Sequence, residues 1–210
     1  NLKTMGWQVF GNDNKLTEIE IPKSLEECRY YRNNDSIDGG TFDNCANLKT
    51  VTFEERTTEI AEGLFAGCTG IEQIRIPDTV TVIESGAFGG CINLKEIVVP
   101  DNVTEIQSSA FEYCSSLKTV KLSENLERIG VYAFGDCDVL KSIKIPDSVL
   151  DIDGAAFAEC KELSDVVLSK NLKTMGWQVF GNDNKLTEIE IPKSLEECRY
   201  YRNNDSIDGG

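Results

Sequence analysis

The sequence predicts an α/β solenoid dominated by β-structure, with about eight to nine coils of 23 residues and a parallel sheet on one face. Three observations predict it: phenylalanines recur at a fixed spacing, the same apolar frame surrounds each of them, and one 40-residue segment occurs twice. The spacing is 32 once and then 23 six times in succession, along Phe10, Phe42, Phe65, Phe88, Phe111, Phe134, Phe157 and Phe180. We therefore treat residues 1–210 as a single repeat domain.

Each unit follows the frame A-F-x-x-C-x-x-L-x-x-I-x-I-P-x-x-V-x-x-I-x-x-x, which is clearest from Ala87 to Pro100. The L-x-x-I-x-I part ends in the apolar alternation of a short, half-buried strand. A proline such as Pro100 has no N–H for a ladder and ends that strand, and a second apolar pair, Val103 and Ile106, follows it. The Phe-x-x-Cys corner is too short for a long helix, so we expect one helical or 3₁₀ turn there.

A 23-residue unit cannot bury its own apolar edge, but stacked units share one continuous core. Equivalent strands then lie in parallel, roughly 4.8 Å apart. The phenylalanines and the cysteines should each form a column along the stack.

Asn1 to Gly40 is identical to Asn171 to Gly210, and the offset of 170 equals one long unit of 32 and six units of 23. Neither end has the polar capping unit that a free-standing solenoid normally needs, so we expect the segment to belong to a longer array. The extra residues of the long unit fall within 29–40 and 199–210, and their Gly, Asn, Asp and Ser predict surface loops. Insertions into repeats often lie on the binding face.

The frame resembles the BspA-like (Treponema pallidum-type) bacterial leucine-rich repeats, over essentially all 210 residues. The resemblance implies a right-handed leucine-rich-repeat superhelix on a secreted or cell-surface protein that adheres to host proteins or other cells. The sequence departs from the pattern at Asp13 and Asp183, which occupy the cysteine position, and in the enlarged loop before Phe42.

Composition excludes several classes of function. With 36 acidic and 21 basic residues the formal net charge is −15, which argues against a nucleic-acid partner. The absence of histidine removes His-based catalysis and His-ligated metals. No apolar run reaches the roughly 18 residues of a membrane span. We expect no cofactor, no metal and no enzymatic activity, because no nucleophile stands beside a base and no phosphate-binding glycine loop occurs.

Six cysteines occupy the same frame position: Cys45, Cys68, Cys91, Cys114, Cys137 and Cys160. Adjacent coils would bring their Cα atoms to roughly 5 Å, which a disulfide tolerates, but side chains in register point the same way. We therefore favour a buried column of free thiols. No C-x-x-C pair supports a zinc or redox site. Cys28 and Cys198 take the position of Ile83 in other units and are expected in the core.

One column of outward-facing strand residues contains Arg75, Lys121 and Lys144 on an otherwise acidic protein. Lys121 and Lys144 would be direct neighbours, and stacked like charges are unfavourable. Two interpretations stay open: an ordinary solvated face, or a site for an acidic partner.

Trp7 and Trp177 stand three residues before a phenylalanine, where the other units have small or polar residues, so both should face outward next to a long loop. Trp7 either packs beneath the loop tyrosines as a satellite cluster or joins them and an arginine in a binding patch. The two copies of this candidate patch are Trp7, Tyr30, Tyr31 and Arg32, and Trp177, Tyr200, Tyr201 and Arg202.

The sequence thus predicts a non-enzymatic, adhesin-like scaffold that binds extracellular or cell-surface proteins. The alternative is a structural spacer, or a stalk whose copies associate head to tail.

Overall fold

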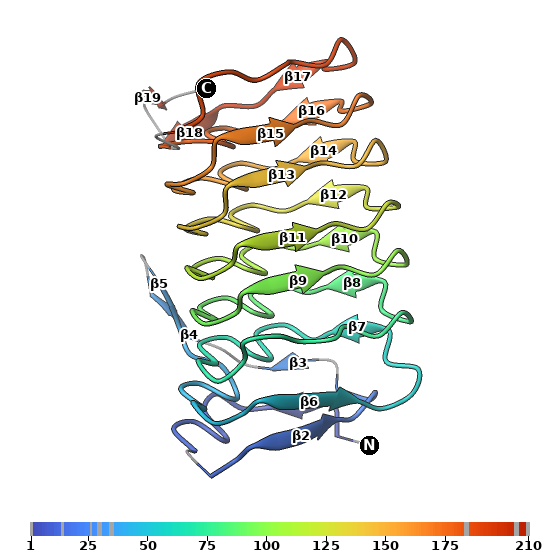
Figure 1. The fold of residues 1–210 in the computed structure, drawn as a ribbon, viewed down its shortest axis with the longest axis vertical. Coiled ribbons are helices and arrows are strands. Elements are labelled where there is room, and N and C mark those ends of the chain that lie inside the picture. The colour runs from blue at the N-terminus through green and yellow to red at the C-terminus, as the bar shows by residue number, and fades with distance from the viewer. Residues whose placement is uncertain are drawn as a thin grey trace.

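The computed structural model describes residues 2–13, 15–25, 27–28, 31–33, 36–182, 185–203 and 206–208. The chain winds into a β-solenoid whose coils stack along one axis (Figure 1). The described part of the chain contains strands and turns but no helix, so the α/β description is not supported. The chain reverses at each Phe-x-x-Cys corner through turns alone.

The largest sheet lies along one side of the stack, with seven parallel strands in a ladder. Its strands are β7 (Glu59–Ile60), β8 (Val82–Ile83), β10 (Glu105–Ile106), β12 (Arg128–Ile129), β14 (Asp151–Ile152), β16 (Thr174–Met175) and β17 (Glu197–Cys198). Successive partners occupy the same position in adjacent repeat units, as in Ile83 opposite Ile106.

This regular winding amounts to about six turns and not the expected eight to nine. The ladder begins at β7, and the extra residues of the enlarged unit stand in the chain between β7 and the strands that precede it on this side. The strands before the interruption, β1 (Thr4–Met5) and β3 (Glu27–Cys28), form a separate two-stranded parallel sheet.

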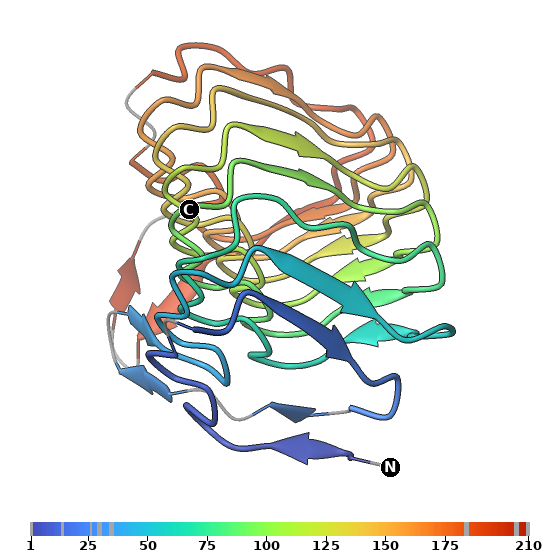
Figure 2. The ribbon, with the colours of Figure 1, turned by 60° about the horizontal axis from the view of Figure 1, so that its bottom comes forward.

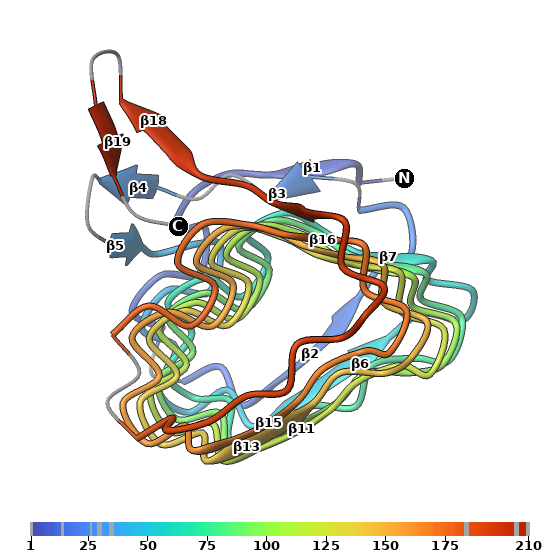
Figure 3. The ribbon, with the colours of Figure 1, turned by 90° about the horizontal axis from the view of Figure 1, so that it is seen from above.

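The opposite side of each coil holds the strands that end near the proline. They are β2 (Glu18–Ile21), β6 (Thr50–Phe53), β9 (Glu96–Val98), β11 (Thr119–Lys121), β13 (Ser142–Lys144) and β15 (Asp165–Val167). They pair in parallel, two by two, again between equivalent positions of adjacent units, and β2 pairs with β6 across the enlarged unit. Figure 2 shows β2 beside β6, and Figure 3 shows both strand layers around the interior.

The phenylalanines stack as one column through the core. Ring centroids are 5.2 Å apart between Phe88 and Phe111 and 5.1 Å apart between Phe111 and Phe134, with nearly parallel planes. Both Phe111 and Phe134 are 0% exposed. Equivalent side chains of adjacent units therefore lie directly on one another, as the repeat predicts.

Two left-handed residues explain why the corner is a turn and not a helix. They lie two positions before and two positions after the phenylalanine, as with Ser109 (φ 59°) and Tyr113 (φ 60°). Non-glycine residues enter this region at a cost of about 1–2 kcal/mol each. Hydrogen bonds to the next coil offset that cost: the Ser109 N–H donates to the Val131 carbonyl at 2.8 Å, and the Tyr113 N–H to the Gly135 carbonyl at 2.9 Å.

The cysteine column consists of free, buried thiols, as expected. Five of the six thiols, all but Cys68, donate a hydrogen bond to the phenylalanine carbonyl of the preceding coil, for example Cys114 Sγ to Phe88 O at 3.3 Å and Cys160 Sγ to Phe134 O at 3.2 Å. A cysteine fits this position because it is small and apolar and still carries a weak donor. Burial raises the pKa of the Cys68 thiol to about 12, so the thiolate is scarcely populated at neutral pH.

Cys198 is exposed, contrary to the expectation that it lies in the core, whereas Cys28 is 0% exposed. Both occupy the expected strand position, and Cys198 lies opposite Met175. Cys198 belongs to β17, which pairs with β16 alone at the edge of the large sheet, whereas the backbone N–H of Cys28 also donates to the Glu62 carbonyl of the following unit at 3.1 Å.

We predict that a single thiol, Cys198, reacts rapidly with Ellman's reagent in the native protein. Exposure controls reactivity here, because the other seven cysteines are buried. A Cys198→Ser variant should lose the rapid phase, while Cys28→Ser, an identical change in an identical local sequence, should keep it. Two or more rapidly reacting thiols in the native protein would contradict the structure.

Candidate binding surfaces

The two inserted segments form antiparallel β-hairpins and not irregular loops. The first pairs β4 (Tyr31–Asn33) with β5 (Ser36–Asp38), and the second pairs β18 (Tyr201–Asn203) with β19 (Ser206–Asp208). Viewed along the axis, both hairpins project from the same corner of the solenoid (Figure 3). The sequence contains a signal for a hairpin, because in both segments a stretch with tyrosine and a stretch with isoleucine flank a short polar turn.

Whether the loop tyrosines pack on the tryptophans stays a prediction, because most of the side chains needed to test it are not described. Tyr30 lies outside the described residues, and only the backbone is described at Tyr31, Arg32, Tyr201 and Arg202.

The two tryptophans lie in different surroundings. Trp7 is 51% exposed. Trp177 is half-buried: its ring meets Tyr132 edge to face at 5.7 Å and lies directly over Gly154, where a Cβ would be 2.2 Å from Trp177 Nε1. Tyr200, from the second copy of the candidate patch, is 47% exposed. Trp7 is therefore the more exposed of the two tryptophans.

A groove beside Trp7 runs along the corner and was missed by sequence reasoning. It is a cavity of about 390 Å³ that Trp7, Gly67, Gly90, Ile92 and Tyr113 line. Gly67 (φ +71°) and Gly90 (φ +72°) occupy the left-handed position after the phenylalanine and bring no side chain of their own, and the Asp43 carboxylate packs over Gly67, where a Cβ would be 2.5 Å from Asp43 Oδ1. The stacked frame contains the signal, because Gly67, Gly90 and Tyr113 occupy the same position in three successive units.

The groove continues past Tyr113 into a second cavity of about 340 Å³ with an acidic lining. Tyr132, Asp136 and Glu159 contribute to it, and Asp136 and Glu159 are one coil apart. Burial, followed by the charge of Glu159, raises the pKa of Asp136 to about 6. Within the described part of the chain, no group of three or more acidic or sulfur ligands is arranged to hold a metal.

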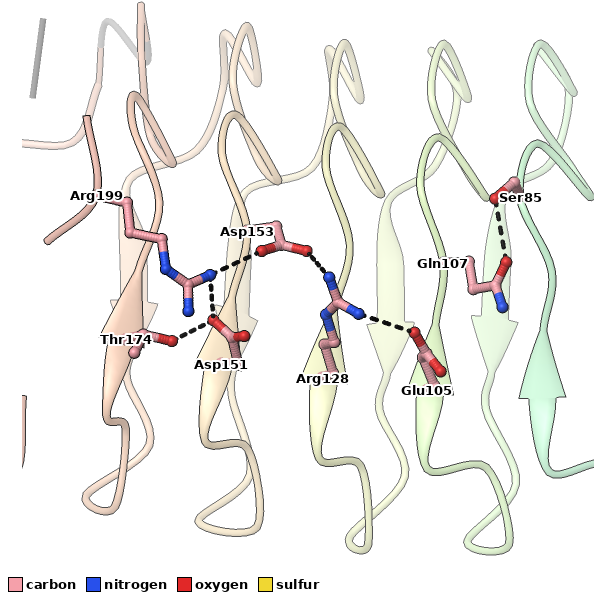
Figure 4. A network of polar contacts seen from close by, with 8 residues as sticks. All are labelled: Ser85, Glu105, Gln107, Arg128, Asp151, Asp153, Thr174 and Arg199. Carbon is pink, nitrogen blue, oxygen red and sulfur yellow. Dashed lines mark hydrogen bonds and ion pairs between the residues drawn. The ribbon is translucent and has the colours of Figure 1, made fainter. Parts of the chain in front are cut away.

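A network of ion pairs joins the coils on the outer face of the large sheet (Figure 4). Arg128 contacts Glu105 at 3.4 Å and Asp153 at 2.6 Å, and Arg199 contacts Asp153 at 3.2 Å and Asp151 at 3.4 Å. The Asp153 side chain is only 11% exposed, and its hydrogen bond raises the pKa of Arg128. These charges satisfy one another from β10 to the end of β17, so we assign the network to stability and not to binding.

Gly176 makes part of this network possible. It lies in the coil between Asp153 and Arg199, and a Cβ on it would be 2.2 Å from the Gly154 nitrogen. Because no side chain stands between them, Arg199 reaches a carboxylate 46 residues earlier in the chain. The frame places Asp153, Gly176 and Arg199 in one column, but the contact across two coils is seen only in the structure.

The third surface is the outer face of the strands around β11 and β13. Arg75, Lys121 and Lys144 are exposed there, as expected. Val98, which is 57% exposed, lies opposite Lys121 and separates Arg75 from the two lysines, so the basic stripe is interrupted. A second row of exposed lysines, Lys118 and Lys141, begins the same strands and was missed, although both are visible in the 23-residue frame.

Comparison with protein families matches the model described as BspA type Leucine rich repeat region, in six copies over residues 3–138 and 81–207. Comparison with curated proteins found no match. The described residues include no helix long and apolar enough to cross a membrane.

Three solved structures are similar. A leucine-rich repeat protein from Bacteroides ovatus has 30% identity and a TM-score of 0.76, over 95% of this chain and 49% of that chain. The T. pallidum Leucine Rich Repeat protein has 26% identity and a TM-score of 0.65, over 82% of each chain. A leucine-rich repeat protein from Eubacterium ventriosum has 21% identity and a TM-score of 0.57, over 88% and 57%, and is alike in fold alone. The chain thus spans about half the length of the Bacteroides ovatus protein.

Proposed function

The chain belongs to the family of BspA-type leucine-rich repeat proteins, and from this premise we propose that it is a non-enzymatic scaffold with an adhesin-like role. It acts outside the cell or on the cell surface and binds extracellular proteins. The observation that carries the proposal is the corner groove between Trp7 and Tyr113.

Three properties of this groove support binding of a protein. It is built on stacked coils, so its shape is set before a partner arrives and little ordering entropy is lost. Trp7 is 51% exposed and Ile92 is 44% exposed, which gives large apolar surface at the rim. Tryptophan and tyrosine are the residue types that most often dominate the binding energy of protein interfaces.

The experiment measures binding of the purified chain to a panel of immobilised extracellular-matrix proteins and to cells. Trp7→Ala and Tyr113→Ala should each weaken the binding by about tenfold or more, as expected for residues at the centre of an interface. Tyr30→Ala tests whether the hairpin takes part. Leu150→Ala removes an equally exposed apolar side chain from another surface and should have no effect. Unchanged binding in both Trp7→Ala and Tyr113→Ala, or no binding to any member of the panel, would reject the proposal.

A second candidate, a spacer or self-associating stalk, is supported by the duplication. Residues 1–40 and 171–210 are identical, and in each copy two short strands (β1 and β3, or β16 and β17) are followed by a hairpin, although β2 has no counterpart in the second copy. A particle mass that grows with concentration in light scattering would support association. A strict monomer at high concentration would leave only the spacer.

A further inference from the structure

Four exposed lysines lie close together in sequence and coil: Lys121 and Lys144 on the outer face of β11 and β13, and Lys118 and Lys141 immediately before these strands. Lys118 and Lys121 come from one coil, and Lys141 and Lys144 come from the next. Adjacent coils are roughly 4.8 Å apart, and three residues along a strand span roughly 10 Å. Four positive charges are therefore concentrated on a small area of a chain whose formal net charge is −15. We call these four residues the lysine patch.

The lysine patch has no ion-pair partner among the residues that the structure describes. Two neighbouring carboxylates are already held by other lysines: Glu162 by Lys185 at 2.6 Å and Asp147 by Lys170 at 3.6 Å. The pKa of Glu162 is lowered by its hydrogen bond to Lys185, and to a smaller extent by the charge of Lys141.

In the coil before the patch, the equivalent lysine has an ion-pair partner. Lys95 occupies the same frame position as Lys118 and Lys141, but it is paired with Glu72 at 2.5 Å. Glu72 also contacts Lys49 at 3.3 Å, so one carboxylate neutralises lysines on both sides. The coils of the patch have no such carboxylate between their lysines, and like charges directly opposite each other are unfavourable. An anionic partner would relieve this repulsion.

The surroundings of the patch favour a polypeptide over a sulfated glycan. Val98 lies opposite Lys121, Val167 lies opposite Lys144, and these two valines are 57% and 51% exposed. The exposed column therefore reads apolar, basic, basic, apolar. A sulfated glycan matches the charges but leaves the valines uncovered, whereas an acidic peptide with apolar neighbours matches both.

We propose that the lysine patch, together with Val98 and Val167, is a docking surface for an acidic polypeptide segment with apolar side chains on either side of its carboxylates. This inference deepens the proposed function by naming the chemistry of one partner. The patch belongs to the strands β11 and β13 and the residues just before them, whereas the groove at Trp7 is lined by residues of the Phe-x-x-Cys corners, so different parts of the coils build the two surfaces. The two proposals can therefore fail separately.

The test uses the full chain and a fluorescein-labelled peptide of four consecutive glutamates between two leucines, with binding followed by anisotropy. Binding should weaken at least tenfold between low and high salt, because it depends on charge. The double variant Lys121→Glu/Lys144→Glu should lose at least tenfold in affinity. The control Lys15→Glu/Lys193→Glu changes the net charge equally at exposed lysines in other coils and should bind normally.

Further variants and probes test whether the valines take part and whether the groove at Trp7 or a sulfated glycan explains the binding. Val98→Ser should weaken the leucine peptide about threefold without affecting an analogue that carries serine in place of leucine. Trp7→Ala should leave peptide binding unchanged, whatever it does to matrix proteins. No binding at low salt, an equal loss in the patch and control double variants, or tighter binding of heparin than of the peptide would overturn the proposal. Circular dichroism melting checks that each variant is folded.

Discussion

Replacing Phe111 with alanine is expected to lower the free energy of unfolding by about 3–5 kcal/mol, the range for phenylalanine truncation in a packed core. The Phe111 ring is 0% exposed and lies between Phe88 at 5.2 Å and Phe134 at 5.1 Å. Its removal takes away apolar burial and leaves a cavity between two rings that remain in place. The rigid corners on both sides limit how far the stack can collapse into that space.

Equilibrium unfolding in urea measures this change, and Phe10→Ala is the control. Phe10 is only partly buried and stacks on a single described ring, Phe42, at 5.2 Å. Its truncation should cost less than half as much. Because each coil packs mainly against its neighbours, amide exchange in Phe111→Ala should rise most in the two coils next to the cavity. A loss of under about 1 kcal/mol for Phe111→Ala would show that the stack does not carry the stability assigned to it.

Gly176→Ala is expected to destabilise the protein by about 2 kcal/mol or more, because a buried Cβ would have to displace backbone. The added atom would be 2.2 Å from the Gly154 nitrogen and 2.5 Å from the Asp153 carbonyl carbon. The coil must move away from its neighbour to admit it. That movement should also separate Arg199 from Asp153, whose ion pair of 3.2 Å is drawn in Figure 4 and whose coils lie on either side of that of Gly176.

The duplication supplies the matched control. Gly6 has the same neighbours in sequence as Gly176, but a Cβ on Gly6 would come no closer than 3.6 Å to Val9. Gly6→Ala should therefore change the free energy of unfolding by about 0.5 kcal/mol or slightly stabilise the chain, as alanine does where the backbone tolerates it. Equal effects of the two substitutions on the thermal midpoint would contradict the tight packing at Gly176.

Much of the fold could be predicted because the 23-residue period assigns every position a stacking partner in the adjacent coil. The phenylalanine column, the thiol column and the outward column with Lys121 and Lys144 all follow from placing residue i on residue i+23. The absence of a helix at the corner did not follow. Ser109 and Tyr113 give no local signal for a left-handed conformation, and hydrogen bonds from the next coil hold them there.

The candidate sites were predicted only in part, for a related reason. The lysine rows and the glycine floor of the groove lie in columns, so the frame contains them once the stacking is known. The ion pairs of Arg199 cross two coils. Gly176 stands between Asp153 and Arg199 in one column of the frame, but only the structure shows that the arginine reaches across that coil. We expected loops where the structure has hairpins, because the nine inserted residues have no equivalent in the other units and the repeat frame therefore predicts nothing about them.

The sequence by itself determined which residues of adjacent coils stack on one another. A repeat of 23 residues allows a common core only when equivalent positions of successive units are in register. The tertiary structure alone decided how deeply each of these residues is buried and which side chains it contacts. Cys28 is buried and Cys198 exposed, and Trp7 is exposed while Trp177 packs on Tyr132, although each pair has the same local sequence. Burial depends on the coil above or below, and that coil lies at least one full repeat away in the chain.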